Sequence, residues 1–135
     1  MKLDYLMLAG AAEARDGLVH IISGSWDTAS RDSYPSLFVG AVVARVIVDA
    51  NEVGPHEITL TWTDDNGAEI APKAQFPVMV NPPPKDAPAG WENSMVMAAT
   101  VHGIPIPAAG LYRLEFRVDG QLLKVQRFRF VQTVG

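Results

Sequence analysis

Residues 56–67 read His-Glu-Ile-Thr-Leu-Thr-Trp-Thr-Asp-Asp-Asn-Gly, and this stretch decides the fold class. From His56 to Thr63 apolar and polar side chains alternate, which is typical of a half-buried strand in an antiparallel sheet. Trp62 falls on the apolar side, so we expect it in the core. The segment 64–67 that follows predicts a hairpin turn, because Asn-Gly tolerates the positive φ that tight turns require.

Similar patterns recur along the chain, where short apolar and β-branched runs are separated by turn residues. No segment has a convincing helical period. The pattern predicts an all-β fold, an immunoglobulin-like antiparallel β-sandwich of seven to eight strands, in a single domain over residues 1–135. The expected strands cover residues 3–9, 18–25, 37–48, 56–63, 68–80, 94–101, 111–118 and 121–131.

Prolines distinguish two segments. Residues 68–80 include Pro72 and Pro77, which cannot donate a backbone hydrogen bond, so we expect this segment at a sheet edge or broken by bulges. Residues 81–90 hold four more prolines, and they predict a stiff, polyproline-like crossover.

The last strand changes phase along its length. Val125 and Phe128 lie on opposite parities, although both are apolar. Because a one-residue slip turns every side chain to the other face of a sheet, we expect a β-bulge near Gln126-Arg127 that restores the phase.

Two expected strands are apolar on both faces. In residues 37–48, Phe38 and Val42 point to one side while Val39 and Val43 point to the other, and residues 94–101 behave similarly. A sandwich strand needs only one apolar face. Either the proline-rich crossover covers the second face, or another copy of the chain does, which would make the protein a homo-oligomer.

Composition excludes several classes of function. The net charge of −4 and pI near 5.2 argue against nucleic acid, which binds basic surfaces. The absence of cysteine excludes disulfides, zinc–thiolate sites, iron–sulfur clusters and cysteine nucleophiles. No apolar run approaches the ~20 residues of a membrane helix. We therefore expect no cofactor, no membrane and no nucleic acid, and a second copy or another protein as the partner.

The first residues allow two interpretations. Ala12-Glu13-Ala14 imitates a signal-peptidase site, which would indicate secretion. However, the preceding apolar run is short, one basic residue precedes it, and Asp4 lies where the run should begin. We therefore expect a first strand in a cytoplasmic protein, with secretion as the alternative.

Three stretches carry a family likeness. They are Leu-Val-His-Ile-Ile-Ser-Gly-Ser-Trp-Asp at 18–27 after a turn at 15–17, His-Glu-Ile-Thr-Leu at 56–60 with the turn at 64–67, and Gly-Leu-Tyr-Arg-Leu-Glu-Phe at 110–116 with Asp119-Gly120. Together they resemble a bacterial family of short proteins catalogued only as a domain of unknown function. Its motifs are strands and turns, and because the family has no assigned activity, the resemblance carries over no catalytic residue.

Local motifs for catalysis are missing from the sequence. A serine hydrolase needs a nucleophile on a tight turn with a histidine base, and the nearest approach, residues 23–27, reads as a strand ending in a turn. His20, His56 and His102 are not spaced as a local metal chelate. We expect them to be isolated strand or loop residues.

One end of the sandwich supplies the most specific binding hypothesis. If each connection reverses direction, the loops at 26–36, 64–67 and 102–110 fall at the same end. Calcium could bind the carboxylates there, and a sugar or a partner could stack on the aromatic rings. Alternatively, the acids are ordinary turn residues and the rings close the core. The candidate residues are Trp26, Asp27, Asp32, Tyr34, Asp64 and Asp65.

The closing hairpin is basic, with five basic residues against two acidic ones in 111–135. One interpretation is a solvated face with cross-strand pairs such as Glu115 with Lys124. The other is a contact with the acidic end of another copy, or with an acidic partner. The basic residues are Arg113, Arg117, Lys124, Arg127 and Arg129.

The sequence thus favours a non-enzymatic binding or assembly module, cytoplasmic and homo-oligomeric. A small-ligand or calcium-binding sandwich that uses the acidic end is the first alternative. An enzyme of unrecognised type is the second, and the missing acid–base and nucleophile pairs argue against it.

Overall fold

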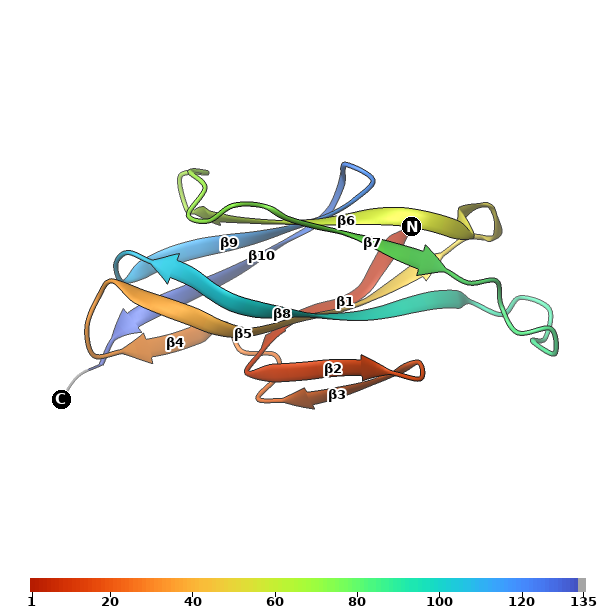
Figure 1. Ribbon diagram of the computed structural model, residues 1–135, viewed down its shortest axis with the longest axis horizontal. Helices are drawn as coiled ribbons and strands as arrows, with labels where there is room; N and C mark the ends of the chain where they lie inside the picture. Colours follow the sequence, from red (N-terminus) through yellow and green to blue (C-terminus); the bar gives the residue numbers. More distant parts are fainter. Residues whose placement is uncertain (134–135) are drawn as a thin grey trace.

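The computed structural model describes residues 1–133 and confirms the all-β fold (Figure 1). These residues form ten strands, so the expected number of seven to eight was too low. Helical structure within them is limited to one 3₁₀ turn, η1 (Ala50–Glu52). The strands are β1 (Lys2–Ala9), β2 (Ala11–Arg15), β3 (Leu18–Ile22), β4 (Thr28–Arg31), β5 (Ser36–Val48), β6 (Gly54–Asp64), β7 (Ala74–Val80), β8 (Asn93–Ile106), β9 (Gly110–Val118) and β10 (Gln121–Gln132).

The strands form three sheets. One has the order β1-β5-β8, a larger one has the order β4-β10-β9-β6-β7, and β2 and β3 form a separate hairpin. The expectation of antiparallel pairing throughout was wrong, because β4 runs parallel to β10. The five-stranded sheet is mixed and curls into half a barrel, so the sheets are not those of a clear immunoglobulin-like sandwich.

The core lies where the alternating sequence of β6 predicts it. β6 pairs with β7 on one side and with β9 on the other, and Trp62 is only 2% exposed. Its ring packs edge-to-face on Phe38 of β5 and Phe128 of β10, with centroids 5.7 and 5.9 Å away. Because the main cluster takes side chains from both larger sheets, their shared apolar surface holds the two sheets together.

Strands β2 and β4 were not expected. Residues 11–15 lack β-branched and aromatic side chains, and residues 28–31 lie in a turn-rich segment that predicted a loop. The chain returns from β2 to β3 through Asp16-Gly17, where both residues have positive φ, as a two-residue hairpin turn requires. β4 forms because the edge of β10 is available to it. In both cases tertiary pairing overrides weak propensity.

The second apolar face of β5 is covered by the β2–β3 hairpin. Ala41 and Val43 are buried beneath it. The proline-rich crossover, which we considered as the cover, lies beside Ile47 at the far end of the strand. The centre of this face therefore needs no second copy, although Leu37 and Val39 are 58% and 61% exposed.

The bulge in the last strand lies earlier than expected. The register of β10 against β9 shifts at Leu123, and pairing is regular through Gln126-Arg127. The shift turns Phe128 and Phe130 into the core and leaves Val125 exposed.

For the edge strands β7 and β8, one prediction is confirmed and one is wrong. β7 lies at the edge of its sheet, as its prolines predict. β8 extends to Ile106, so residues 102–106, expected in a loop, are strand. A register shift at His102-Gly103 allows β8 to keep pairing with the start of β5.

Several connections lie at the same end of the molecule, because successive strands run in alternating directions. Figure 1 shows the β4–β5, β6–β7 and β8–β9 connections at one end of the molecule, with the β7–β8 crossover at the other. The first group contains Asp32, Tyr34 and Asp65, and Asp64 ends β6 beside it, whereas Trp26 and Asp27 lie in the β3–β4 connection.

Candidate functional site

The two aromatic residues of the predicted site pack into the core. Trp26 makes edge-to-face contacts with Phe38, Phe128 and Phe130, at centroid distances of 5.2, 6.1 and 6.0 Å. Tyr34 is half-buried and donates a hydrogen bond to the carbonyl oxygen of Val131 at 2.7 Å. Both rings close one end of the core.

Asp64 and Asp65 are occupied by neighbours within the chain. Asp64 Oδ1 accepts hydrogen bonds from the amides of Asn66 and Ala68, at 2.9 and 3.0 Å, and so fixes its own turn. Asp65 Oδ1 accepts a hydrogen bond from Arg127 at 2.8 Å. These contacts engage one oxygen, Oδ1, of each carboxylate.

Asp27 and Asp32 are exposed, and neither takes part in the hydrogen bonds of the turn that Asp64 fixes. Asp27 Oδ1 accepts a hydrogen bond from Thr28 at 3.0 Å and lines a shallow hollow of about 210 Å³ with Arg127. Asp32 contributes its backbone carbonyl, which accepts a hydrogen bond from Gln132. Over residues 1–133, no three acidic or histidine side chains come close enough together to hold a metal ion.

The basic hairpin meets acids of its own chain. Arg127 reaches Asp65, and Arg117 pairs with Glu115 at 3.2 Å. The expected pair between Glu115 and Lys124 was wrong, because the bulge at Leu123 places Val125 opposite Glu115. Part of the charge complementarity that suggested an intermolecular contact is therefore intramolecular.

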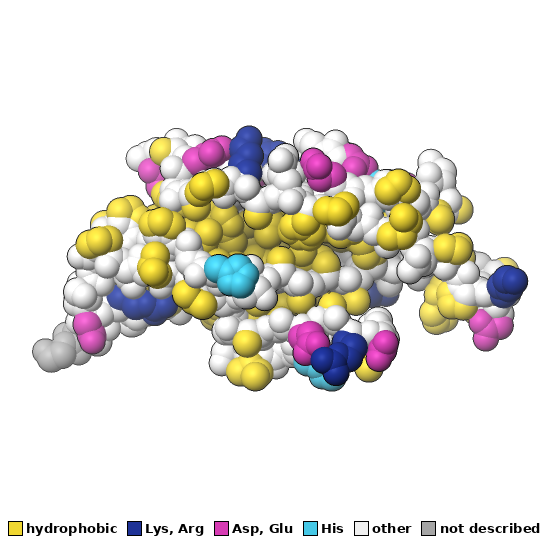
Figure 2. All heavy atoms as spheres, in the orientation of Figure 1, with side chains coloured by type: hydrophobic (Ala, Val, Ile, Leu, Met, Phe, Trp, Pro, Cys, Tyr) yellow, Lys and Arg dark blue, Asp and Glu magenta, His cyan; other side chains and the backbone are white. Residues whose placement is uncertain are grey.

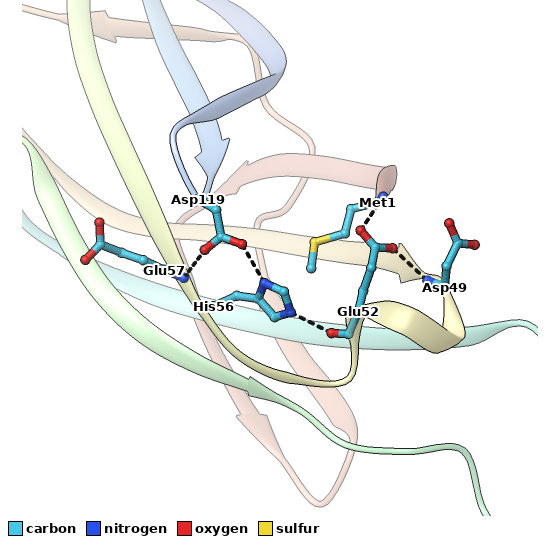
Figure 3. A network of polar contacts seen from close by, with 6 residues as sticks. All are labelled: Met1, Asp49, Glu52, His56, Glu57 and Asp119. Carbon is cyan, nitrogen blue, oxygen red and sulfur yellow. Dashed lines mark hydrogen bonds and ion pairs between the residues drawn. The ribbon is translucent and has the colours of Figure 1, made fainter.

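A polar network that the sequence did not indicate lies at the opposite end (Figure 3). His56, at the start of β6, contacts Asp119 Oδ2 through Nδ1 at 2.6 Å and the carbonyl oxygen of Glu52 through Nε2 at 2.5 Å. An ionised carboxylate and a carbonyl oxygen only accept hydrogen bonds, so the imidazolium form of His56, which donates from both ring nitrogens, satisfies both contacts. Asp119 Oδ1 also accepts a hydrogen bond from the amide of Glu57 at 2.9 Å.

The hydrogen bonds of this network shift three pKa values. The bond to Asp119, then the bond to the Glu52 carbonyl, raises the pKa of His56 above its ordinary 6.5. The same bond from His56, then the Glu57 amide, lowers the pKa of Asp119 below 3.8. The ammonium group of Met1, 2.8 Å away, is the first cause that lowers the pKa of Glu52 below 4.5.

Chemically, the His56 network is a clamp. The turn holds Asp119 at φ 50° and Gly120 at φ 81°, and the Asp119 carboxylate is thereby aimed at β6. Neither ring nitrogen of His56 is free to take a proton from a substrate, because each already donates to a fixed acceptor. The clamp ties η1 and β6 to the β9–β10 turn.

A third feature is an apolar groove between the edge strands β7 and β8. It holds about 300 Å³, with Phe76 of β7 on one wall, Leu60 and Trp62 of β6 at its base, and residues 99–104 of β8 on the other wall. Its lining contains no Asp, Glu, Lys or Arg. Figure 2 shows hydrophobic side chains running along this open side of the molecule between the two layers.

Both walls of the groove are sheet edges. Within the described residues, β7 pairs only with β6, and β8 pairs only with β5. The outward backbone groups of both strands therefore border the groove without a strand partner. Sequence reasoning identified the β7 edge from its prolines. It missed the β8 edge, for which the signal was a run of 14 residues, 93–106, with no charged side chain other than the ionisable His102.

A family model described as "Family of unknown function (DUF6941)" matches residues 4–131. The chain belongs to this family. No curated protein matches it significantly. In the part of the chain that the structure describes, no helix is long and apolar enough to cross a membrane.

Membership of DUF6941 assigns no activity, so the geometry of the chain is what distinguishes one surface from another. In the His56 clamp both ring nitrogens and both Asp119 oxygens are engaged within the chain, and at the acidic end Asp64 and Asp65 each have one carboxylate oxygen engaged. The β7–β8 groove is different, because it combines exposed apolar surface with unpaired strand edges.

Proposed function

We propose that this DUF6941 chain is a non-enzymatic binding or assembly module on a β-sandwich scaffold, and that the β7–β8 groove is its binding surface. The observation that carries the proposal is the uncharged apolar lining between two unpaired edges. We further propose a protein partner and a cytoplasmic location, which the sequence favours.

The chemistry of the groove suits an extended polypeptide. An added strand can hydrogen-bond to a free sheet edge, while its alternate side chains enter an adjacent apolar groove. Burial of apolar surface contributes roughly 25 cal/mol per Å², and exposed apolar patches on soluble proteins commonly mark interaction surfaces. A small polar ligand or a sugar finds few fixed polar partners here, since the lining side chains are mainly aliphatic and aromatic.

The alternatives have weaker support. For calcium or another small ligand at the acidic end, Asp64 and Asp65 would bind beside the hydrogen bonds and the ion pair that already engage one oxygen of each carboxylate. For an enzyme, His56 would have to leave both of its acceptors to serve as a base.

Two lysine substitutions on β7 test the proposal. Ala74 lines the groove, whereas its neighbour Gln75 points to the other face of the strand. Both side chains are exposed, so neither substitution should disturb the fold. We expect Ala74→Lys to place an ammonium group at the mouth of the groove and to weaken binding, while Gln75→Lys adds the same charge without entering it.

The measurement is quantitative affinity capture from a lysate with wild type, Ala74→Lys and Gln75→Lys as baits. The proposal expects a protein, which can be the chain itself, that is retained by wild type and Gln75→Lys and lost by at least tenfold with Ala74→Lys. Equal recovery by all three baits, or no retained protein at all, would contradict it. Thermal unfolding of the three baits checks that they are equally folded.

A further inference from the structure

The four strands at the edges of the two larger sheets differ in how well they resist pairing. β1 carries Lys2 and Asp4, β4 is four residues long and ends in Arg31, and β7 contains Pro77. Charges, prolines and short length are the devices by which proteins discourage pairing at an edge. β8 has none of them over residues 93–101, and its regular course ends only at the register shift at His102-Gly103.

We infer that β8 pairs with β8 of a second copy, antiparallel and centred on Met97, to form a continuous six-stranded sheet. The inference rests on the proposed function and names the partner. Antiparallel pairing of a strand with its own copy is isologous, so residues on either side of the centre face one another across a two-fold axis.

Charge favours this edge for contact between copies. Each chain carries a net charge of −4, so two copies repel one another, and contact at an uncharged surface adds the least repulsion to this. Residues 93–101 (Asn-Ser-Met-Val-Met-Ala-Ala-Thr-Val) present no charge, and like residues can face one another there without repulsion.

Burial of apolar side chains adds to the backbone pairing. Met95 and Ala99 are only partly buried and lie on the core side of β8, beside the groove. Nine paired residues span about 30 Å, and a single strand pair covers less than the roughly 800 Å² per partner of a standard interface. We therefore expect a dimer that dissociates at low concentration.

The test uses positions that the two-fold axis makes opposite. With Met97 at the centre, Ser94 of one copy faces Thr100 of the other. Ser94→Lys/Thr100→Lys places two pairs of like charges across the interface, whereas Ser94→Glu/Thr100→Lys places two pairs of opposite charges there. The two positions are six residues apart in the monomer, so both variants test the contact between copies.

Light scattering after size exclusion gives the mass of each variant over a concentration series, and thermal unfolding confirms that each is folded. We expect wild type and Ser94→Glu/Thr100→Lys to reach twice the 14.6 kDa of the chain at high concentration. We expect Ser94→Lys/Thr100→Lys to need at least tenfold higher concentration to do so. Ser30→Lys on β4, at the far edge of the other sheet, is the control and should behave as wild type.

Three results would overturn the inference: a wild-type monomer at every concentration, a dimer that both double variants retain equally, and a dimer that both lose. If the wild type is a monomer but a different protein is captured in a manner sensitive to Ala74→Lys, the groove binds another chain. In that case the proposed function stands and the second copy does not. If nothing is captured either, both fail.

Discussion

The His56 clamp predicts that the protein becomes less stable as the pH rises from mildly acidic to mildly alkaline. In the folded protein the hydrogen bond to Asp119, followed by the one to the Glu52 carbonyl, raises the pKa of His56 above 6.5. A group whose pKa is higher in the folded state contributes stability that is complete below its unfolded pKa. That contribution is lost as the pH rises through the folded pKa. The loss therefore begins near neutrality.

The size of the effect follows from the contacts. A hydrogen bond between charged groups contributes about 1.5–3 kcal/mol when it is well shielded. Here the His56 side chain is 15% exposed but the Asp119 side chain is 53% exposed, so solvent screening reduces the value. We expect a loss of about 1 kcal/mol in the free energy of unfolding between about pH 5.5 and pH 8.5.

Urea unfolding at a series of pH values measures this directly. In His56→Gln most of the slope should be lost, because the histidine of the clamp is gone. In Asp119→Asn the slope should shrink, while asparagine still tolerates the positive φ of the turn. His20→Gln, on the exposed hairpin, is the control and should keep the wild-type slope. A wild-type curve that is flat over this range, or a His56→Gln curve as steep as wild type, would refute the reasoning.

Three further predictions concern the core and the acidic end. Trp62→Ala should destabilise the protein by about 3–5 kcal/mol, because it empties the centre of the core; urea unfolding measures this, and a loss below 1 kcal/mol would contradict the packing. Gly40→Ala should destabilise by about 1–3 kcal/mol, since its Cβ would collide with the backbone carbonyl oxygen of Ala9; a melting temperature equal to wild type would be inconsistent with that contact. Millimolar calcium should leave the melting temperature unchanged, because Asp64 and Asp65 are engaged within the chain. A melting temperature that rises with calcium would contradict this and would support a calcium site at the acidic end.

The acidic and aromatic end shows why residue type alone predicted a site poorly. Aspartate is frequent in turns because its side chain accepts hydrogen bonds from nearby amides, and Asp64 does this. Trp26 is placed by its edge-to-face contacts with three phenylalanines of β5 and β10. The sequence gives the location of such residues at one end. Whether their polar atoms are free depends on neighbours that are distant in the chain.

His56 and Asp119 make a contact that residue type and local pattern did not predict. They are 63 residues apart, and the strand and turn patterns to which they belong give no sign that the two side chains meet. The pairing register of β6 with β9 brings the start of β6 beside the β9–β10 turn. That register results from packing of the whole sheet, so no short-range sequence pattern could have predicted the contact between His56 and Asp119.

By itself the sequence determined the all-β fold, the buried position of Trp62, the edge position of β7 and the need for a bulge in the last strand. These features follow from local alternation of side chains and from the missing amide of proline. Only the tertiary structure decided the parallel β4–β10 pair, the hairpin that covers β5, and the groove between β7 and β8. Each of these depends on which edges are left unpaired after the rest of the chain has folded, and this is a property of the complete arrangement of strands.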